Sequence, residues 1–264
     1  MGTMQRRTFL AAGALSVAGL SGCLSSGGGG SGSYPTPEDG DTDGYPPASD
    51  DPPKKKSVDV ASLPTVTESG QQIPLLPVDV AMNWHQRGEA RFADARGKKQ
   101  YDTSHVEGAV LSPAPGIETN FDEDPVLDWP KGDRVICYCG CPHHLSSLRA
   151  AALKNSGYEN VLVIDEGFWA WHDRGYPING QNTDAAPANY AIAGVAGEKF
   201  AGKSAWARHP DSGQSEATNI AADGSYTLHL KFHDVTPDST VAVETPAYTV
   251  EGTLEELSNG VVTG

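Results

Sequence analysis

The chain has 264 residues, with 19 Lys and Arg against 34 Asp and Glu, which gives a formal net charge of −15. This length is sufficient for one large domain or two small ones with hydrophobic cores of their own. The acidic excess disfavours nucleic acid as a partner, because its phosphates would be repelled. No internal stretch of about 20 apolar residues is present, which excludes a polytopic membrane protein. Four cysteines are too few for a scaffold built on disulfides.

Residues 1–22 have the order of an export signal. Arg6 and Arg7 form a twin-arginine start, a weakly apolar run follows, and the segment ends in Leu20-Ser21-Gly22-Cys23. These last four residues resemble the lipobox of bacterial and archaeal lipoproteins. The resemblance implies that the twin-arginine route exports the chain and that a lipid on Cys23 anchors it to the outer face of the cell membrane. The alternative is an ordinary secretory signal with an accidental cysteine.

Residues 23–57 contain four consecutive glycines and many Pro, Asp, Ser and Thr residues, with almost no aliphatic side chains. Such a segment buries too little apolar surface to offset the entropy lost on ordering, so we expect a flexible tether. The acidic composition of the chain also resembles that of proteins from salt-loving archaea.

Strand and helix patterns alternate through residues 58–184. The predicted strands cover 91–95, 110–111, 134–138 and 161–164, and the predicted helices cover 78–84, 145–155 and a segment beginning at 168. This alternation indicates a parallel sheet with helices on its faces. Ligands of such sheets lie beyond the carboxyl ends of the strands.

Three of the four cysteines gather at one such strand end. The strand 134–138 runs into Cys139-Gly140-Cys141-Pro142-His143-His144-Leu145 and then directly into a helix. Backbone N–H groups and the positive end of the helix dipole meet at this kind of junction, which stabilises a thiolate and lowers its pKa. The same N–H groups could hold a small sulfur-containing anion or the outer sulfur of a persulfide. His143 and His144 could tune the thiolate.

Several motifs in this region occur in the order found in one family, and the chain resembles the rhodanese family over residues 73–180. The matching segments are Phe92-Ala93-Asp94-Ala95-Arg96, Tyr101 to Ala109, Val135 to Cys139, Gly157-Tyr158, Glu166 to Trp171 and Gly175-Tyr176-Pro177. The resemblance implies a rhodanese-like α/β fold and a sulfurtransferase. Such an enzyme carries sulfane sulfur, from thiosulfate or a similar donor to a thiol or cyanide acceptor, as a cysteine persulfide. No cofactor and no resident metal are expected.

The loop departs from the family pattern, in which the cysteine is followed by four residues and an Arg. Here no Arg occurs before Arg149. A phosphatase, which needs that Arg to hold a phosphate, is therefore disfavoured. Thiosulfate carries a lower charge density, and backbone amides together with His143 or His144 could bind it.

Two cysteines of the loop are candidates for the nucleophile. Cys139 matches the family position and is favoured, Cys141 is an alternative nucleophile or assisting thiol, and Cys137 is expected to be a small buried hydrophobe. Two other functions stay open for this cluster. One is a non-catalytic module that binds Zn, Cu or a partner, and the other is a thiol–disulfide pair of Cys139 and Cys141.

Residues 185–264 change to short strands separated by Gly, Pro, Asp and Asn. The predicted strands cover 190–195, 204–208, 222–230, 241–243 and 248–250. This spacing indicates a small antiparallel β-sandwich. We expect it to be a spacer or contact module that contributes no chemistry.

Overall fold

The computed structural model describes residues 43–118 and 124–264. The predicted export signal, the lipobox with Cys23 and the first part of the predicted tether lie outside the described residues. Within them, no helix combines the length and the apolar character needed to cross a membrane.

A six-stranded sheet forms the centre of the first domain, in the order β1-β2-β7-β6-β3-β5. The strands β2, β7, β6, β3 and β5 run parallel, and β1 pairs antiparallel with β2 at one edge. Their bounds are β1 Thr65–Glu68, β2 Gln71–Leu76, β3 Arg91–Asp94, β5 Val110–Leu111, β6 Arg134–Tyr138 and β7 Asn160–Ile164. A short pair, β4 His105–Val106 and β8 Ile178–Asn179, lies apart from this sheet.

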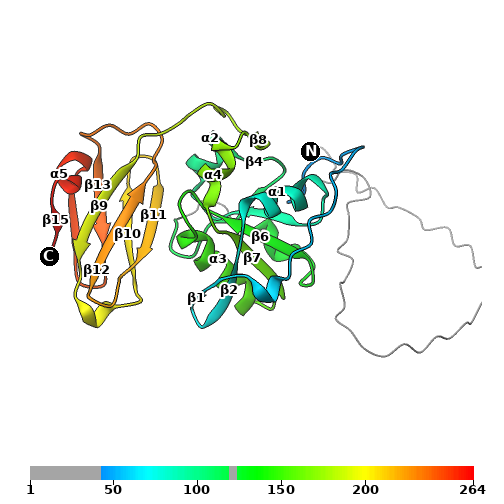
Figure 1. Ribbon diagram of the computed structural model, residues 1–264. Helices are drawn as coiled ribbons and strands as arrows, with labels where there is room; N and C mark the ends of the chain where they lie inside the picture. The colour runs from blue at the N-terminus through cyan, green and yellow to red at the C-terminus, as the bar shows by residue number, and fades with distance from the viewer. Residues whose placement is uncertain (1–42, 119–123) are drawn as a thin grey trace, which may run out of the picture. The chain divides into compact units, whose positions relative to one another are not determined.

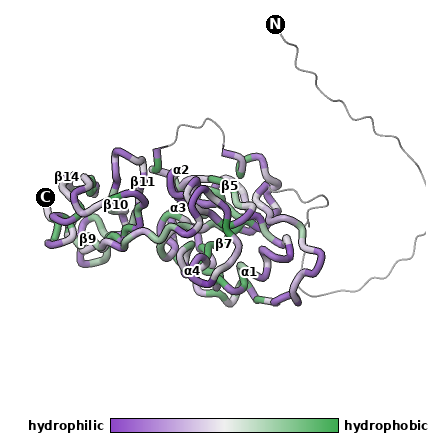
Figure 2. Tube along the Cα trace, turned by 90° about the horizontal axis from the view of Figure 1, so that it is seen from above, coloured by the Kyte–Doolittle hydropathy of each residue, from purple (hydrophilic) through white to green (hydrophobic). Residues whose placement is uncertain are grey.

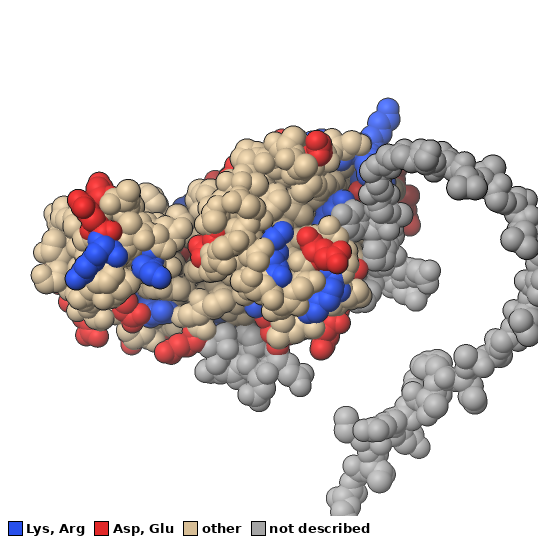
Figure 3. Space-filling view, turned by 90° about the horizontal axis from the view of Figure 1, so that it is seen from below, with Lys and Arg blue, Asp and Glu red and all other residues tan. Residues whose placement is uncertain are grey.

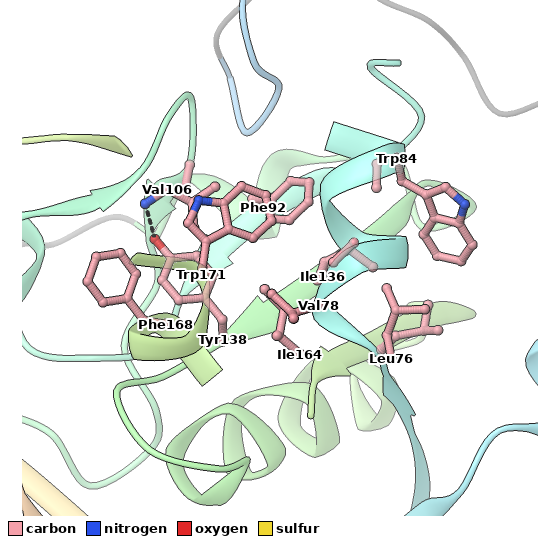
Figure 4. Packing of buried hydrophobic residues seen from close by; sticks show 14 of the residues in the cluster. Leu76, Val78, Trp84, Phe92, Val106, Ile136, Tyr138, Ile164, Phe168 and Trp171 are labelled. Carbon is pink, nitrogen blue, oxygen red and sulfur yellow. Dashed lines mark hydrogen bonds between the residues drawn. The ribbon is translucent and has the colours of Figure 1, made fainter. Parts of the chain in front are cut away.

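Helices cover both faces of the parallel sheet (Figure 1). The helices are α1 Val78–Gln86, α2 Lys98–Thr103, α3 His144–Asn155 and α4 Gly167–Asp173, with short 3₁₀ turns η1 Val60–Ser62 and η2 Pro125–Asp128. One core packs α1 and α4 against one face, and Figure 4 shows Trp171, Phe92 and Ile136 within it. The other core packs α3 against the opposite face through Ala150, Ala151 and Leu153. The predicted α/β architecture is confirmed.

The strands lie inside because they are almost wholly apolar. Every residue of β6 is buried, and four of the five residues of β7 are buried. Parallel strands that are covered on both faces need such continuous apolar runs. Figure 2 shows this hydrophobic stretch near β7 with more hydrophilic segments around it.

Two further sheets make up the C-terminal region. One has the order β11-β10-β13-β14 and the other the order β12-β9-β15, and residues of both sheets share one apolar core. The elements are β9 Tyr190–Val195, η3 Glu198–Phe200, β10 Ser204–His209, β11 Gln214–Asn219, β12 Ser225–Leu230, β13 Thr240–Glu244, β14 Thr249–Thr253, α5 Leu254–Ser258 and β15 Val261–Val262. The predicted all-β domain is confirmed, but β15 pairs parallel with β9 and the sequence patterns missed β11.

The predicted tether differs from the structure from Asp43 onward. The Arg91 side chain donates hydrogen bonds to the backbone and side chain of Asp43, and Phe92 N donates to Gly44 O at 2.6 Å. Tyr45 is buried, with the Arg91 guanidinium 4.6 Å from its ring centre. Composition alone suggested disorder, but these contacts with the folded domain fix the segment.

Charged side chains of both signs lie next to each other on the face shown in Figure 3. Partly exposed ion pairs among the described residues include Arg208 with Glu244 at 2.8 Å and Lys99 with Asp234 at 2.6 Å. Exposed pairs of this kind contribute little stability, about 1 kcal/mol or less each. The stability of the fold therefore depends mainly on the three apolar cores.

Gly167 is the first residue of α4 and lies beside the cysteine loop, so replacing it with Ala should displace that loop. Gly167 has φ +76°, and a Cβ there would lie 2.7 Å from Cys141 O and 3.0 Å from Cys139 O. Gly175, just beyond the other end of α4, has φ +66° and open space around its Cβ position. We expect Gly175→Ala to cost about 1–2 kcal/mol from strain alone, and Gly167→Ala about 1–3 kcal/mol more. Urea unfolding measures both, and equal losses would contradict the expected clash.

Candidate active site

Cys139 lies at the carboxyl end of β6, at the junction with α3, as the sequence predicted. Its side chain has no exposed surface and packs against Leu145 and Ala217. The backbone N–H groups of Leu145 and Ser146, in the first turn of α3, donate to its sulfur. These N–H groups have no partner within the helix, so the sulfur atom satisfies them.

The hydrogen bonds around Cys139 favour its thiolate. Burial alone raises the pKa of this thiol, but hydrogen bonds from the Cys141 thiol, the Ser146 hydroxyl and the two α3 amides outweigh burial and lower the pKa to about 7. As a neutral thiol, Cys139 Sγ donates to Cys141 O at 3.1 Å and lies 3.4 Å from Ser146 Oγ. A thiolate is the reactive form of cysteine, so Cys139 is ready for nucleophilic chemistry near neutral pH.

Cys141 is more exposed than Cys139, and its thiol is less acidic. It is half-buried and lines a cavity of about 320 Å³ together with Trp169, Glu216 and Lys231. Its hydrogen bond to Cys139 is the main reason that its pKa is raised well above the ordinary value, and burial adds to this. The two thiols of the loop therefore differ in both accessibility and acidity.

Glu216 is a member of this site that the sequence did not indicate. Cys141 Sγ donates to Glu216 Oε2 at 3.5 Å, and the Glu216 side chain is 1% exposed. Burial first, and the charge of Cys139 second, raise the pKa of Glu216 to about 8. Gly140 allows this approach, since a Cβ on residue 140 would lie 3.0 Å from Glu216 Oε1.

The strand β11 carries Glu216 and belongs to the C-terminal region. The same strand places Thr218 Oγ1 3.3 Å from His144 Nε2 and packs Ala217 against Cys139 and Leu145. The C-terminal region, expected to be a spacer or contact module, therefore contacts the cysteine loop and supplies a buried carboxylate to it. No pattern in the sequence indicated this contact, since β11 is a polar run without apolar alternation.

The two loop histidines have different surroundings. His144 Nδ1 lies 3.7 Å from Cys141 Sγ, and burial lowers the pKa of His144 to about 4, so the ring is neutral near pH 7. His143 Nδ1 instead pairs with Asp165 Oδ1 at 3.2 Å. Pro142 lines the cavity beside Cys141.

The remaining candidate residues are buried in a core or held in ion pairs. Cys137 is fully buried in β6, and burial raises its pKa to about 12. Asp94 and Arg96 form a buried ion pair with a distance of 2.6 Å. Arg149, the first Arg after the loop, donates to Ser112 Oγ at 2.8 Å and pairs with Asp124, so it does not serve the cysteine loop.

The described residues contain no group of three or more His, Cys, Asp or Glu side chains arranged to hold a metal ion. Cys137, Cys139 and Cys141 are free thiols. The arrangement therefore presents two adjacent thiols and one carboxylate, which is suited to thiol and persulfide chemistry.

Comparison with known proteins agrees with this chemistry. The Rhodanese-like domain family matches residues 78–174. The thiosulfate sulfurtransferase GlpE of two Vibrio cholerae serotype O1 strains is 31% identical over 104 residues, which are 39% of this chain and 92% of the relative. The chain belongs to the rhodanese-like family.

Solved rhodanese structures also match the chain. The solution structure of a rhodanese-like domain from Anabaena sp. is 24% identical, covers 44% of this chain and 85% of its own, and has a TM-score of 0.37. An E. coli rhodanese with anions is 24% identical, covers 34% of this chain and 96% of its own, and has a TM-score of 0.27.

The raised pKa of Glu216 predicts a pH-dependent loss of stability. Folded Glu216 keeps its proton up to about pH 8, whereas its ordinary value is 4.5, so between these values the folded state binds more protons than the unfolded state. Its contribution to stability therefore falls as the pH rises through this window. Glu216→Gln cannot ionise, so its advantage over the wild type should grow from about pH 5 to about pH 6, where Cys139, with a pKa of about 7, is still largely protonated.

Urea unfolding at several pH values measures this difference. Glu251→Gln removes one carboxylate from an exposed position on β14 and serves as the control. We expect its stability curve to run parallel to that of the wild type. A Glu216→Gln curve that also runs parallel would contradict the raised pKa.

Proposed function

We propose that this protein is a sulfurtransferase in which Cys139 is the nucleophile. The observation that carries the proposal is the buried Cys139 sulfur, which receives two amide N–H groups at the start of α3 and has its pKa lowered to about 7. The membership of the rhodanese-like family and the thiosulfate sulfurtransferase relative support the same reaction class.

The first half of the reaction loads the enzyme. The Cys139 thiolate attacks the outer sulfur of thiosulfate or a similar donor, the sulfur–sulfur bond of the donor breaks, and sulfite leaves with the electron pair. A persulfide remains on Cys139, and the amides of Leu145 and Ser146 stabilise its charge. Because Cys139 has no exposed surface, the donor reaches it when the Cys141 side chain moves aside.

The second half passes the outer sulfur to an acceptor, a thiol or cyanide. The acceptor attacks the outer sulfur of the persulfide, and Cys139 leaves as a thiolate. A low thiol pKa makes Cys139 a good leaving group. The same amides therefore assist both halves, because a negative sulfur occupies their site at the start and at the end.

Incubation with thiosulfate should add the mass of one sulfur atom to the wild-type chain. Cys139→Ser should abolish the addition and lower the transfer rate by at least about a thousandfold, because the nucleophile is lost. Cys137→Ala is the control, since Cys137 lies in β6 only two residues before Cys139 but is buried in a core away from the loop, and it should keep the sulfur adduct. Intact-mass spectrometry and sulfite release measure both outcomes. A Cys139→Ser variant that still turns over thiosulfate would refute the assignment.

We also propose that the enzyme acts on the outer face of the cell membrane, anchored through a lipid on Cys23. The twin Arg6-Arg7 start and the Leu20-Ser21-Gly22-Cys23 segment support this. Cys23→Ser should move the protein from the membrane fraction to the soluble fraction of a host with the twin-arginine route. Immunoblots of the two fractions test it, and membrane binding equal to the wild type would contradict the lipid anchor.

A further inference from the structure

The two loop thiols lie in series between the cavity and the protein interior. Cys139 has no exposed surface, whereas Cys141 lines the cavity of about 320 Å³. The backbone of Cys141 accepts the Cys139 thiol hydrogen bond at 3.1 Å, so the two residues are in direct contact. A molecule in the cavity therefore meets Cys141 before it meets Cys139.

A proton acceptor lies beside the outer thiol. Cys141 Sγ donates to Glu216 Oε2 at 3.5 Å, and both groups line the same cavity. Glu216 is buried, has a further hydrogen bond with the Gln100 side chain and feels the charge of Arg96, but its Oε2 faces the Cys141 sulfur, where it can take part in proton transfer. The Cys141 sulfur also has polar contacts with Cys139 and with His144, the latter at 3.7 Å.

The two thiols also differ in a way that sets the direction of sulfur exchange. In an exchange between two thiols, the less basic thiolate leaves more readily and the more basic one is the stronger nucleophile. The amides of α3 stabilise the Cys139 thiolate, while Cys141 has a raised pKa. Sulfur therefore moves more favourably from Cys139 to Cys141 than in reverse.

We propose that Cys141 is a second sulfur carrier, which takes the outer sulfur from the Cys139 persulfide with Glu216 as the proton-transferring residue, and presents it to a small thiol in the cavity. This proposal rests on the proposed function of Cys139. It gives the C-terminal domain a direct part in the reaction, since Glu216 comes from β11.

The step is balanced without an oxidant or a reductant. Protonated Glu216 gives its proton to the outer sulfur of the Cys139 persulfide and recovers one from the Cys141 thiol. The Cys141 thiolate then attacks that outer sulfur, and the bond between the outer sulfur and Cys139 Sγ breaks. Cys139 leaves as a thiolate that the α3 amides hold, and Cys141 carries the persulfide.

A single-turnover experiment tests the relay. The full chain is loaded with thiosulfate, quenched at intervals with an alkylating reagent that traps persulfides, digested, and sequenced by tandem mass spectrometry. In the wild type we expect the sulfur first on Cys139 and then on Cys141. In Cys141→Ser it should stay on Cys139, and transfer to an added small thiol such as cysteine should fall at least about tenfold.

Glu216 is tested in the same experiment. Glu216→Gln should still form the Cys139 persulfide but slow its passage to Cys141 by about a hundredfold, the scale of general acid–base catalysis. Glu216→Asp, which keeps the carboxylate, should recover part of this loss, and Glu251→Gln should match the wild type. In the wild type the transfer rate should fall as Glu216 loses its proton, and Glu216→Gln should lack this fall, which a merely structural role would not produce.

The outcomes separate this proposal from the one on which it rests. Sulfur on Cys139 alone in the wild type, together with unchanged transfer by Cys141→Ser, would overturn the relay and leave the Cys139 reaction intact. A Glu216→Gln variant as fast as the wild type would overturn the role of Glu216. An absence of any sulfur adduct in the wild type would instead overturn the proposed function itself.

Discussion

The hydrogen bonds between the first turn of α3 and the Cys139 sulfur are the interaction on which this site depends. A buried thiolate is costly unless donors surround it, and here Leu145 N, Ser146 N and the Ser146 hydroxyl donate to it. The single hydrogen of the Cys141 thiol is donated either to this thiolate or to Glu216. The donors are in place because β6 passes into α3 within a few residues. Packing of both elements in the sheet cores therefore fixes the chemistry of one sulfur atom.

The C-terminal domain adds a second ionisable group, the carboxyl of Glu216, to this arrangement. Burial, and after it the charge of Cys139, raises the pKa of Glu216, so the site does not readily hold a full charge on both groups. Arg96 opposes this effect, since its charge lowers the pKa of Glu216, but its guanidinium is already paired with Asp94. A shared charge of this kind allows a proton to move within the cluster as the sulfur changes its bonding.

The sequence predicted the elements whose signals are local. The apolar runs of β6 and β7, the helical spacing of α3 and the junction at Cys139 all appear in the structure as expected. The strand β11 could not be found in this way, because Glu216 and its neighbours are polar. Their burial depends in part on contacts with residues far away in sequence, including Cys141, His144 and Cys139. For the same reason composition misjudged residues 43–57, whose order comes from Arg91 and other partners in the folded domain.

The missing loop arginine argues against phosphate chemistry at this site. Binding a phosphate needs a paired guanidinium fork close to the nucleophile. Arg149 is held by Ser112 and Asp124, Arg96 is held by Asp94, and a carboxylate, Glu216, covers the loop instead. A sulfane sulfur bound to a cysteine is a smaller and softer group, and for its transfer between two thiols a nearby carboxylate is an asset because it can carry the proton.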